Sequence, residues 1–188
     1  MKPEITSREA ILAACRRITA TRGLHAVSMR AVATEAHVAL GTLYHYFSDK
    51  DELLIAAVES VWQDILHLNG PEEAPPGFPD CVAGLYRRAR TGAASYPGFL
   101  TAHSVILAGA RSEEARQAMA RVFEQLREGL LSALQHDPQV RPDAFGPTFT
   151  PDALTELVLD NVLLLLIREA EDCTPLTGLL RAALYPRP

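Results

Sequence analysis

The sequence predicts an all-α fold in which a small N-terminal domain precedes a larger helical domain. Apolar residues recur at helical spacing along most of the chain, whereas the alternating pattern of β-strands is scarce. Charge is divided unevenly: residues 1–50 carry seven Lys and Arg against four Asp and Glu, and residues 51–188 carry eleven against nineteen. A basic N-terminal region on an acidic body is typical of nucleic-acid-binding proteins with a second domain. Chance surface charge would give the same totals, so charge alone leaves both interpretations open.

The overall composition argues against disulfide-rich, zinc-binding and membrane-spanning proteins. The chain has 188 residues, 48% of them hydrophobic, enough for one sizeable core or for a small domain joined to a larger one. Its three cysteines are far apart, so neither a disulfide framework nor a zinc site is predicted. The N-terminus has no apolar signal segment, and the longest apolar run, within residues 157–167, is shorter than the ~18 residues of a membrane span. We therefore expect a cytoplasmic protein with no membrane partner.

Two helices are expected before residue 37. "TSRE" has the pattern of a capping box, with Thr6 as the cap and Glu9 reaching back to it. Gly23 lies where a glycine commonly ends a helix. Ser28 is expected to cap the second helix, because apolar residues at helical spacing follow it directly.

A tight turn at His37 separates the second helix from a short third helix at about residues 40–46. Such turns often use glycine, but histidine is among the residues that tolerate positive φ. Ala39 leaves the third helix without a Ser or Thr cap, a loss of about 1 kcal/mol. A fourth helix is expected from Asp49, with Glu52 at its third position, and it connects the N-terminal domain, residues 1–50, to the body.

Residues 51–188 are expected to form the second helical domain. "NGPEEAPPGFP", residues 69–79, interrupts it, because its prolines and glycines cannot continue a helix. Beyond this break the apolar spacing predicts helices at about residues 80–94, 97–109, 113–136, 151–171 and 175–184. Thr150 and Thr174 each precede a proline and are expected to cap the last two helices.

The third helix is rich in aromatic side chains for its length, as "GTLYHYF", residues 41–47, shows. On a helix, Leu43 and Phe47 lie one turn apart and are expected to face the core, while Thr42, His45 and Tyr46 share the outward face. Hydroxyls suit phosphate oxygens, and Thr or His side chains can reach base edges. The alternative is that the tyrosines pack against the next helix as ordinary half-buried aromatics.

Two short helices joined by a turn of three or four residues form a helix-turn-helix, whose second helix enters the major groove of DNA. With this arrangement, residues 27–58 resemble the TetR/AcrR family of bacterial regulators. The family pattern, G-T-L-Y-x-[HY]-F-x-x-K-x-x-L, is matched position for position by residues 41–53. The resemblance covers roughly the first third of the chain; the rest matches in length, helicity and apolar character alone.

The resemblance implies contact with a double-stranded DNA operator through the start of the second helix, the third helix and the lysine that opens the fourth. The positions implicated are Ser28, Arg30, Leu40, Gly41, Thr42, Tyr44, His45, Tyr46 and Lys50. Tyr44, Tyr46 and Lys50 would hold phosphates, and Leu40, Thr42 and His45 would face bases.

Two departures from the family pattern weaken this expectation. His37 replaces the usual turn glycine, and Ala39-Leu40 replaces a serine followed by a polar or basic residue. Leu40 can touch a thymine methyl group but cannot hydrogen-bond a base.

For the body, the resemblance implies a homodimer formed through the last two long helices and a pocket for a small-molecule effector. The helix predicted at residues 151–171 is apolar nearly all round, which requires burial on more than one side. One side for the core and one for a partner satisfies this, and the alternative is a central helix in a monomer. In a dimer, two recognition helices about one DNA turn apart would read a pseudo-palindrome.

The candidate ligand-binding residues lie in apolar helical sequence and are Trp62, Tyr96, Phe99, His103, Met119, Phe123 and Asn161. Each can equally be an ordinary structural residue. Asp160 and Asn161 lie within a helix and need polar partners if they are buried. The composition of these helices favours an apolar or aromatic effector.

No catalytic residue, metal site or cofactor is predicted. The sequence contains no H-E-x-x-H, G-x-S-x-G or phosphate-loop motif, and its six histidines are scattered. We therefore expect a non-enzymatic, ligand-responsive dimeric transcriptional regulator, most simply a repressor released from its operator by an effector. The alternative is a helical protein-interaction module that keeps the fold without operator binding, which His37, Ala39 and Leu40 favour.

Overall fold

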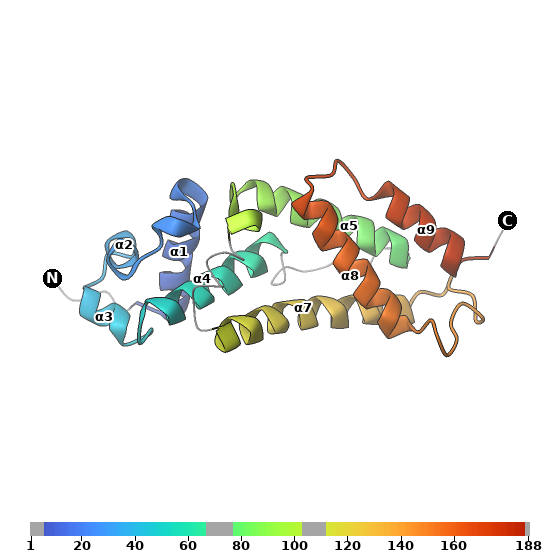
Figure 1. Ribbon diagram of the computed structural model, residues 1–188, viewed down its shortest axis with the longest axis horizontal. Coiled ribbons are helices and arrows are strands. Elements are labelled where there is room, and N and C mark those ends of the chain that lie inside the picture. Colours follow the sequence, from blue (N-terminus) through green and yellow to red (C-terminus); the bar gives the residue numbers. More distant parts are fainter. Residues whose placement is uncertain (1–5, 67–76, 103–111, 187–188) are drawn as a thin grey trace. The chain divides into compact units, whose positions relative to one another are not determined.

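The computed structural model describes residues 6–66, 77–102 and 112–186, and its regular elements in these ranges are all helices (Figure 1). They are α1 (Arg8–Arg22), η1 (Leu24–Ala26), α2 (Met29–Glu35), α3 (Leu40–Tyr44), α4 (Lys50–Ile65), α5 (Phe78–Ala94), α7 (Ser112–Gln135), α8 (Pro151–Ile167) and α9 (Thr174–Leu184). Residues 99–102 are also helical, and most of the helix predicted at residues 97–109 lies outside the described residues. The predicted all-α fold is confirmed.

The chain forms two compact units. Unit 1 combines Met1–Ile65 with Gly92–Val122, and unit 2 combines Leu66–Thr91 with Phe123–Pro188. Helices α5 and α7 therefore each contribute residues to both units. The domain boundary predicted at residue 50 divides the chain by function and stays a prediction.

Unit 1 is built on α1, which contacts both α2 and α4. The inner stripe of α1, Ile11, Cys15 and Ile18, is completely buried. Burial raises the pKa of the Cys15 thiol to about 12. This cysteine is therefore neutral at physiological pH and acts as a core residue.

The start of α1 differs from the prediction by one residue. Ser7, rather than Thr6, is the N-cap, and its Oγ accepts a hydrogen bond of 3.1 Å from the backbone N–H of Ala10. Glu9 does not reach back to the cap, because it forms an ion pair of 2.7 Å with Arg16. The predicted capping box is therefore wrong, although the Ser7 cap still satisfies one of the orphan N–H groups of the first turn.

Helix α4 is held in unit 1 by three neighbours. Arg16 of α1 donates a hydrogen bond to Oγ of Ser60, and Arg121 of α7 bonds to the Glu59 carboxylate at 3.2 Å. Near its end, α4 approaches α5 so closely that a methyl group on Gly92 would lie 2.5 Å from the carbonyl oxygen of Ile65. These contacts fix the helix that follows the helix-turn-helix.

Separate segments of unit 2 are connected by the carboxylate of Asp137, which is almost completely buried. Its Oδ2 accepts from the backbone N–H of Phe78 and from the hydroxyl of Tyr185, both at 2.7 Å, and its Oδ1 accepts from the N–H of Gln139 at 2.9 Å. Burial alone would raise the pKa of Asp137, but these hydrogen bonds outweigh it and hold the pKa below its usual range. The carboxylate therefore ties the start of α5 to the end of the chain.

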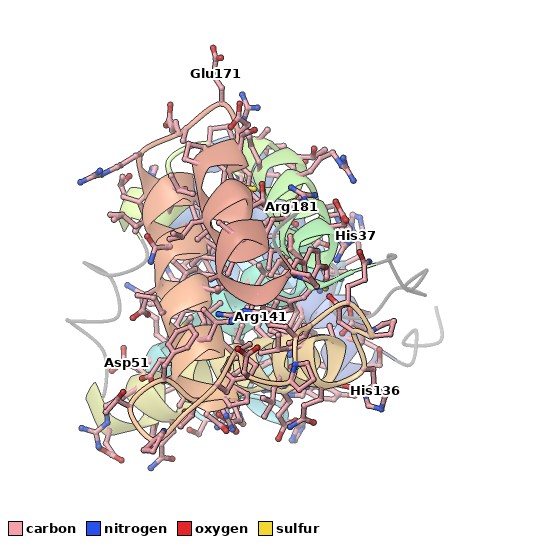
Figure 2. The ribbon with its side chains drawn as sticks, turned by 90° about the vertical axis from the view of Figure 1, so that its right-hand side faces the viewer. His37, Asp51, His136, Arg141, Glu171 and Arg181 are labelled. Atoms are coloured by element: carbon pink, nitrogen blue, oxygen red, sulfur yellow. The ribbon has the colours of Figure 1, made fainter. Side chains whose placement is uncertain are left out.

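Two arginines attach α9 to the rest of unit 2, and both are labelled in Figure 2. Arg181 on α9 forms an ion pair of 2.5 Å with Asp80 on α5. Arg141, in the loop before α8, donates to the carbonyl of Ala183 at 3.2 Å.

The ends of α8 and α9 differ from the prediction. Helix α8 stops at Ile167 rather than near residue 171, because Glu169 adopts a φ of 53° that reverses the chain. The predicted Thr174 cap of α9 is wrong, since the helix already begins at Thr174 and the N–H of that residue donates to Asp172 at 2.7 Å.

Replacing His37 with glycine is expected to stabilise the fold by about 0.5–1 kcal/mol, because His37 has a φ of 55° that glycine adopts without steric cost. The free energy of unfolding measured with urea checks this. Ala36, in the same turn with a φ of −83°, is the control, since Ala36→Gly is expected to destabilise. Equal effects of the two substitutions would contradict strain at His37.

Candidate nucleic-acid interface

Helices α2 and α3 form a helix-turn-helix in unit 1, with α2 contacting both α1 and α3 (Figure 1). Ser28 caps α2 as predicted, since its Oγ accepts from the N–H of Ala31 at 3.3 Å. The turn closes through hydrogen bonds from His37 to Thr34 at 3.2 Å and from Val38 to Ala33 at 3.0 Å. Ala39 provides no side-chain cap for α3, also as predicted.

Helix α3 is anchored by its two predicted core residues. Leu43 and Phe47 are both 0% exposed. The guanidinium carbon of Arg8 lies 5.1 Å from the centre of the Phe47 ring, within the range of a cation–π interaction. A helix as short as α3 is not stable alone, so this burial is what holds it in place.

The opposite side of α3 is open to solvent. Leu40, Gly41, Tyr44 and His45 are exposed, with Tyr44 at 52%, and Thr42 is half-buried. A methyl group on Gly41 would meet no atom within 4 Å, so the backbone here can approach a ligand closely. Arg30, in the first turn of α2, is exposed as well. The predicted DNA-facing residues of α3 are therefore accessible.

Tyr46 lies differently from this group. It is half-buried, and its hydroxyl donates a hydrogen bond of 2.6 Å to the backbone carbonyl of Thr6. A phenol has one proton to donate, so in this arrangement Tyr46 cannot also donate to a phosphate. The contact instead joins the end of α3 to the start of α1.

Lys50 is positioned by a cap at the start of α4. Asp49 accepts from the N–H of Glu52 at 2.9 Å, as predicted for the cap. The Glu52 carboxylate in turn accepts from the N–H of Ser48 at 2.7 Å. These bonds fix the first turn of α4, of which Lys50 is the exposed first residue.

Three of the predicted ligand-binding residues gather in unit 1. The rings of Trp62 and Phe99 meet edge to face with centres 5.7 Å apart, and the Tyr96 ring lies 6.3 Å from Phe99. All three side chains are buried. Tyr96 donates to the Asp64 carboxylate at 2.7 Å. Burial, together with this carboxylate, raises the pKa of Tyr96 well above its usual range.

The other predicted ligand-binding residues do not join this cluster as a group. Met119 belongs to unit 1, whereas Phe123 and Asn161 belong to unit 2, and all three are half-buried. Asn161 donates from Nδ2 to the carbonyl of Leu157 at 2.8 Å, so its own helix satisfies part of the hydrogen-bonding capacity of its side chain. His103 lies outside the described residues.

Three structural contributors were missed by the sequence analysis: Arg8 over Phe47, Thr6 as the acceptor for Tyr46, and Asp64 as the acceptor for Tyr96. The first two pairs are 39 and 40 residues apart in the sequence, so no local spacing signals them. Among residues 6–66, 77–102 and 112–186 there is no group of three His, Cys, Asp or Glu that could hold a metal ion. None of the helices in the same ranges has the length and hydrophobicity that a membrane span requires.

Comparison with known proteins identifies the helix-turn-helix. Residues 11–57 match the model of bacterial regulatory proteins of the tetR family. These are the residues that form most of α1, the helix-turn-helix and the first part of α4. This region belongs to the TetR family. The resemblance inferred from residues 41–53 is thereby confirmed.

Curated relatives match this chain over its N-terminal part. The transcriptional repressor KstR of Rhodococcus jostii is 41% identical over 70 residues, which are 37% of this chain and 32% of that protein. The regulator PksA of Bacillus subtilis is 41% identical over 58 residues, 31% of this chain and 28% of that protein. The matched part thus spans about a third or less of each relative's length.

Solved structures extend the likeness in fold to almost the whole chain. The multidrug-binding protein EbrR complexed with imidazole has a TM-score of 0.62 at 22% identity and covers 98% of both chains. BioQ with its double-stranded DNA operator has a TM-score of 0.61 at 21% identity and covers 94% of both chains. At these identities the likeness establishes a TetR-type fold.

Proposed function

We propose that this TetR-family chain is a homodimeric, ligand-responsive transcriptional repressor that binds a pseudo-palindromic DNA operator. The observation that carries the proposal is the division of α3 into two sides: Leu43 and Phe47 are completely buried, while Thr42, Tyr44 and His45 remain accessible. A short helix buried on one side and polar on the other fits the recognition helix of a helix-turn-helix. Acting on DNA also places the protein in the cytoplasm, and the proposal involves no catalysis or cofactor.

Each DNA-facing residue has a role that its chemistry suits. Tyr44 and Lys50 would hold phosphates, since a hydroxyl donor and an ammonium group both bind phosphate oxygens. Thr42 and His45 would reach base edges. Arg30 and the Gly41 backbone would lie against the sugar–phosphate chain.

Homodimerisation is supported by apolar side chains exposed on the last two helices. On α8, Leu157 is 51%, Leu164 44% and Ile167 52% exposed, and on α9 Leu179 is exposed as well. Exposed apolar side chains of this kind, carried by two helices of one unit, favour an interface. A dimer would place two copies of α3 about one DNA turn apart, which suits a pseudo-palindrome.

A small, mostly apolar effector is supported by the aromatic cluster of Trp62, Tyr96 and Phe99. EbrR, which shares this fold, has been solved with ethidium and with proflavin, both flat aromatic molecules. The cluster includes a residue of α4, the helix that begins with Lys50. An effector that favours one position of α4 over another would change DNA affinity.

Selection of binding sites from a random DNA pool at near-physiological salt tests the proposal. Enrichment of a pseudo-palindrome is the expected result. A folded dimer that enriches no sequence, with or without aromatic and apolar effectors, would overturn it. That outcome would favour the alternative of an interaction module that lost operator binding, which the exposed apolar Leu40 supports. Such a module would also lack a salt-dependent affinity for DNA.

Substitutions at Lys50 and Tyr46 are expected to weaken DNA binding in different ways. Lys50→Ala removes a phosphate contact from each copy, so the slope of log affinity against log salt should fall by about 2 per dimer. Tyr46→Phe removes the bond to Thr6 and should weaken binding several-fold, at about 1 kcal/mol for a hydrogen bond, with an unchanged slope.

DNA titrations at several salt concentrations measure both effects. Arg116→Ala, which removes an exposed cation from α7, is the control and should change neither value. If the slope of log affinity against log salt falls equally for Tyr46→Phe and Lys50→Ala, Tyr46 contacts a phosphate after all.

A further inference from the structure

Helix α8 has two apolar sides, and one of them is covered within unit 2. Leu154, Val158 and Leu166 are among the residues buried there. The opposite side carries Leu157, Leu164 and Ile167, each about half exposed. A helix with this second apolar side needs a further partner to cover it.

One acidic residue interrupts the exposed side. Leu157, Asp160, Leu164 and Ile167 follow one another at spacings of three, four and three residues, so they form one stripe along the helix. Asp160 is exposed within this stripe. Its carboxylate has no ion pair or side-chain hydrogen bond with any residue that the structure describes.

A surface that covers this stripe must also supply a cation. Covering an ionised carboxylate without a partner costs several kcal/mol. Arg168 is the single basic residue among residues 151–168, and it is exposed. It lies about 12 Å along the helix from Asp160, too far for an ion pair within one chain. Within the described ranges, the Arg168 side chain has no ion pair either.

The position of these two charges selects how α8 pairs with a second copy. In a parallel pair, Asp160 would face its own copy and Arg168 would do the same, which places like charges together. In an antiparallel pair centred on Leu164, residues four before and four after the centre face each other. Asp160 then meets Arg168 of the partner subunit, and the symmetry of the dimer repeats this contact once.

We propose that Asp160 and Arg168 of the partner subunit form two symmetric ion pairs that set the antiparallel register of α8 in the dimer. The proposal rests on the homodimer proposed above and names the residues that select its register. The second copy is the occupant that fits, because α8 presents Asp160 within the stripe and its cap residue Arg168 supplies the complementary charge. A polar pair inside an apolar seam selects one alignment because every other alignment leaves charges buried and unpaired.

Charge reversal of the full-length chain tests the pairing. Asp160→Arg and Arg168→Asp should each raise the dimer dissociation constant at least about tenfold, because like charges would face each other twice. The double variant should recover the wild-type value. An equimolar mixture of the two single variants should form heterodimers, since both pairs are then complementary. Analytical ultracentrifugation gives the dissociation constants, and native mass spectrometry separates heterodimers from homodimers.

Glu128→Arg on α7 is the matched control for Asp160→Arg. It makes the same change from a negative to a positive charge at an exposed residue outside α8. Circular dichroism melting identifies any variant that fails to fold. Single variants that dimerise like the wild type would overturn the ion pairs while leaving the homodimer intact. A folded double variant that stays as weak as the single ones would also overturn them. A wild-type chain that is monomeric at micromolar concentration would instead contradict the proposed dimer, and the register with it.

Discussion

Phe47→Ala is expected to lower the free energy of unfolding by about 3–5 kcal/mol, the usual cost of removing a buried phenylalanine. Phe47 is 0% exposed, and with Leu43 it forms the anchored side of α3. The substitution also removes the ring that lies beneath Arg8. Because native proteins are stable by only about 5–15 kcal/mol, this loss should release α3 and abolish DNA binding.

Tyr44→Ala is the matched control, since it removes a similar ring from the same segment. Tyr44 is 52% exposed, so its loss should cost less than about 1 kcal/mol of stability. DNA binding should nevertheless weaken, because Tyr44 is proposed to hold a phosphate. Urea denaturation and DNA titration of both variants measure the two effects. Equal destabilisation by the two substitutions would contradict the proposed division of the segment into a buried and an exposed side.

The sequence predicted this division because it depends on local spacing. Leu43 and Phe47 are four residues apart, which puts them on one side of a helix wherever that helix packs. The Ser28 and Asp49 caps were predicted for the same reason, because a cap bonds to a backbone group three residues away. Such features follow from the backbone geometry of a few consecutive residues.

Contacts between distant residues were not predicted. Helical spacing predicts that Tyr46 shares the outward face with Thr42 and His45, yet its hydroxyl donates to the carbonyl of Thr6 at 2.6 Å. A helical spacing gives the direction of a side chain from its own helix and does not tell which segment lies there. The same applies to the start of α1, where Thr6 and Ser7 are both suitable caps and packing decides between them.

The ligand-binding residues were the least predictable part of the chain. The only sequence signal for these residues is that they are aromatic and lie in apolar helices. Phe123, which belongs to the other unit, has the same signal as the clustered Trp62, Tyr96 and Phe99. The sequence also does not distinguish the exposed side of α8 from its buried side, because nearly every position of that helix is apolar. Amphipathic spacing carries no information when both sides of a helix are hydrophobic.

Gly92→Ala is expected to destabilise the protein by about 1–3 kcal/mol, the range for a methyl group forced into a packed site. The added carbon would lie 2.5 Å from the carbonyl oxygen and 2.8 Å from the Cα of Ile65. Both are backbone atoms, so no side-chain rotation can relieve the overlap. Helix α4 must then shift from α5, and urea denaturation measures the cost.

Gly129→Ala on α7 is the control, because a methyl group there would meet no atom within 4 Å. It should stabilise the helix by roughly 0.5–1 kcal/mol, as alanine does in an exposed helix interior. The two glycine substitutions are therefore expected to have opposite signs. A Gly92→Ala variant as stable as the wild type would contradict the close approach of α4 and α5.

The Gly92 variant also tests how strongly the position of α4 affects DNA binding. Lys50 opens α4 and Ile65 closes it, so a displacement at Ile65 is carried along a helix to a proposed phosphate contact. If α4 governs the placement of the helix-turn-helix, DNA affinity should fall by more than the loss of folded protein explains. If affinity per folded molecule is unchanged, the displacement of α4 stays local to its end at Ile65. An effector at the aromatic cluster would then have to act on DNA binding by another route.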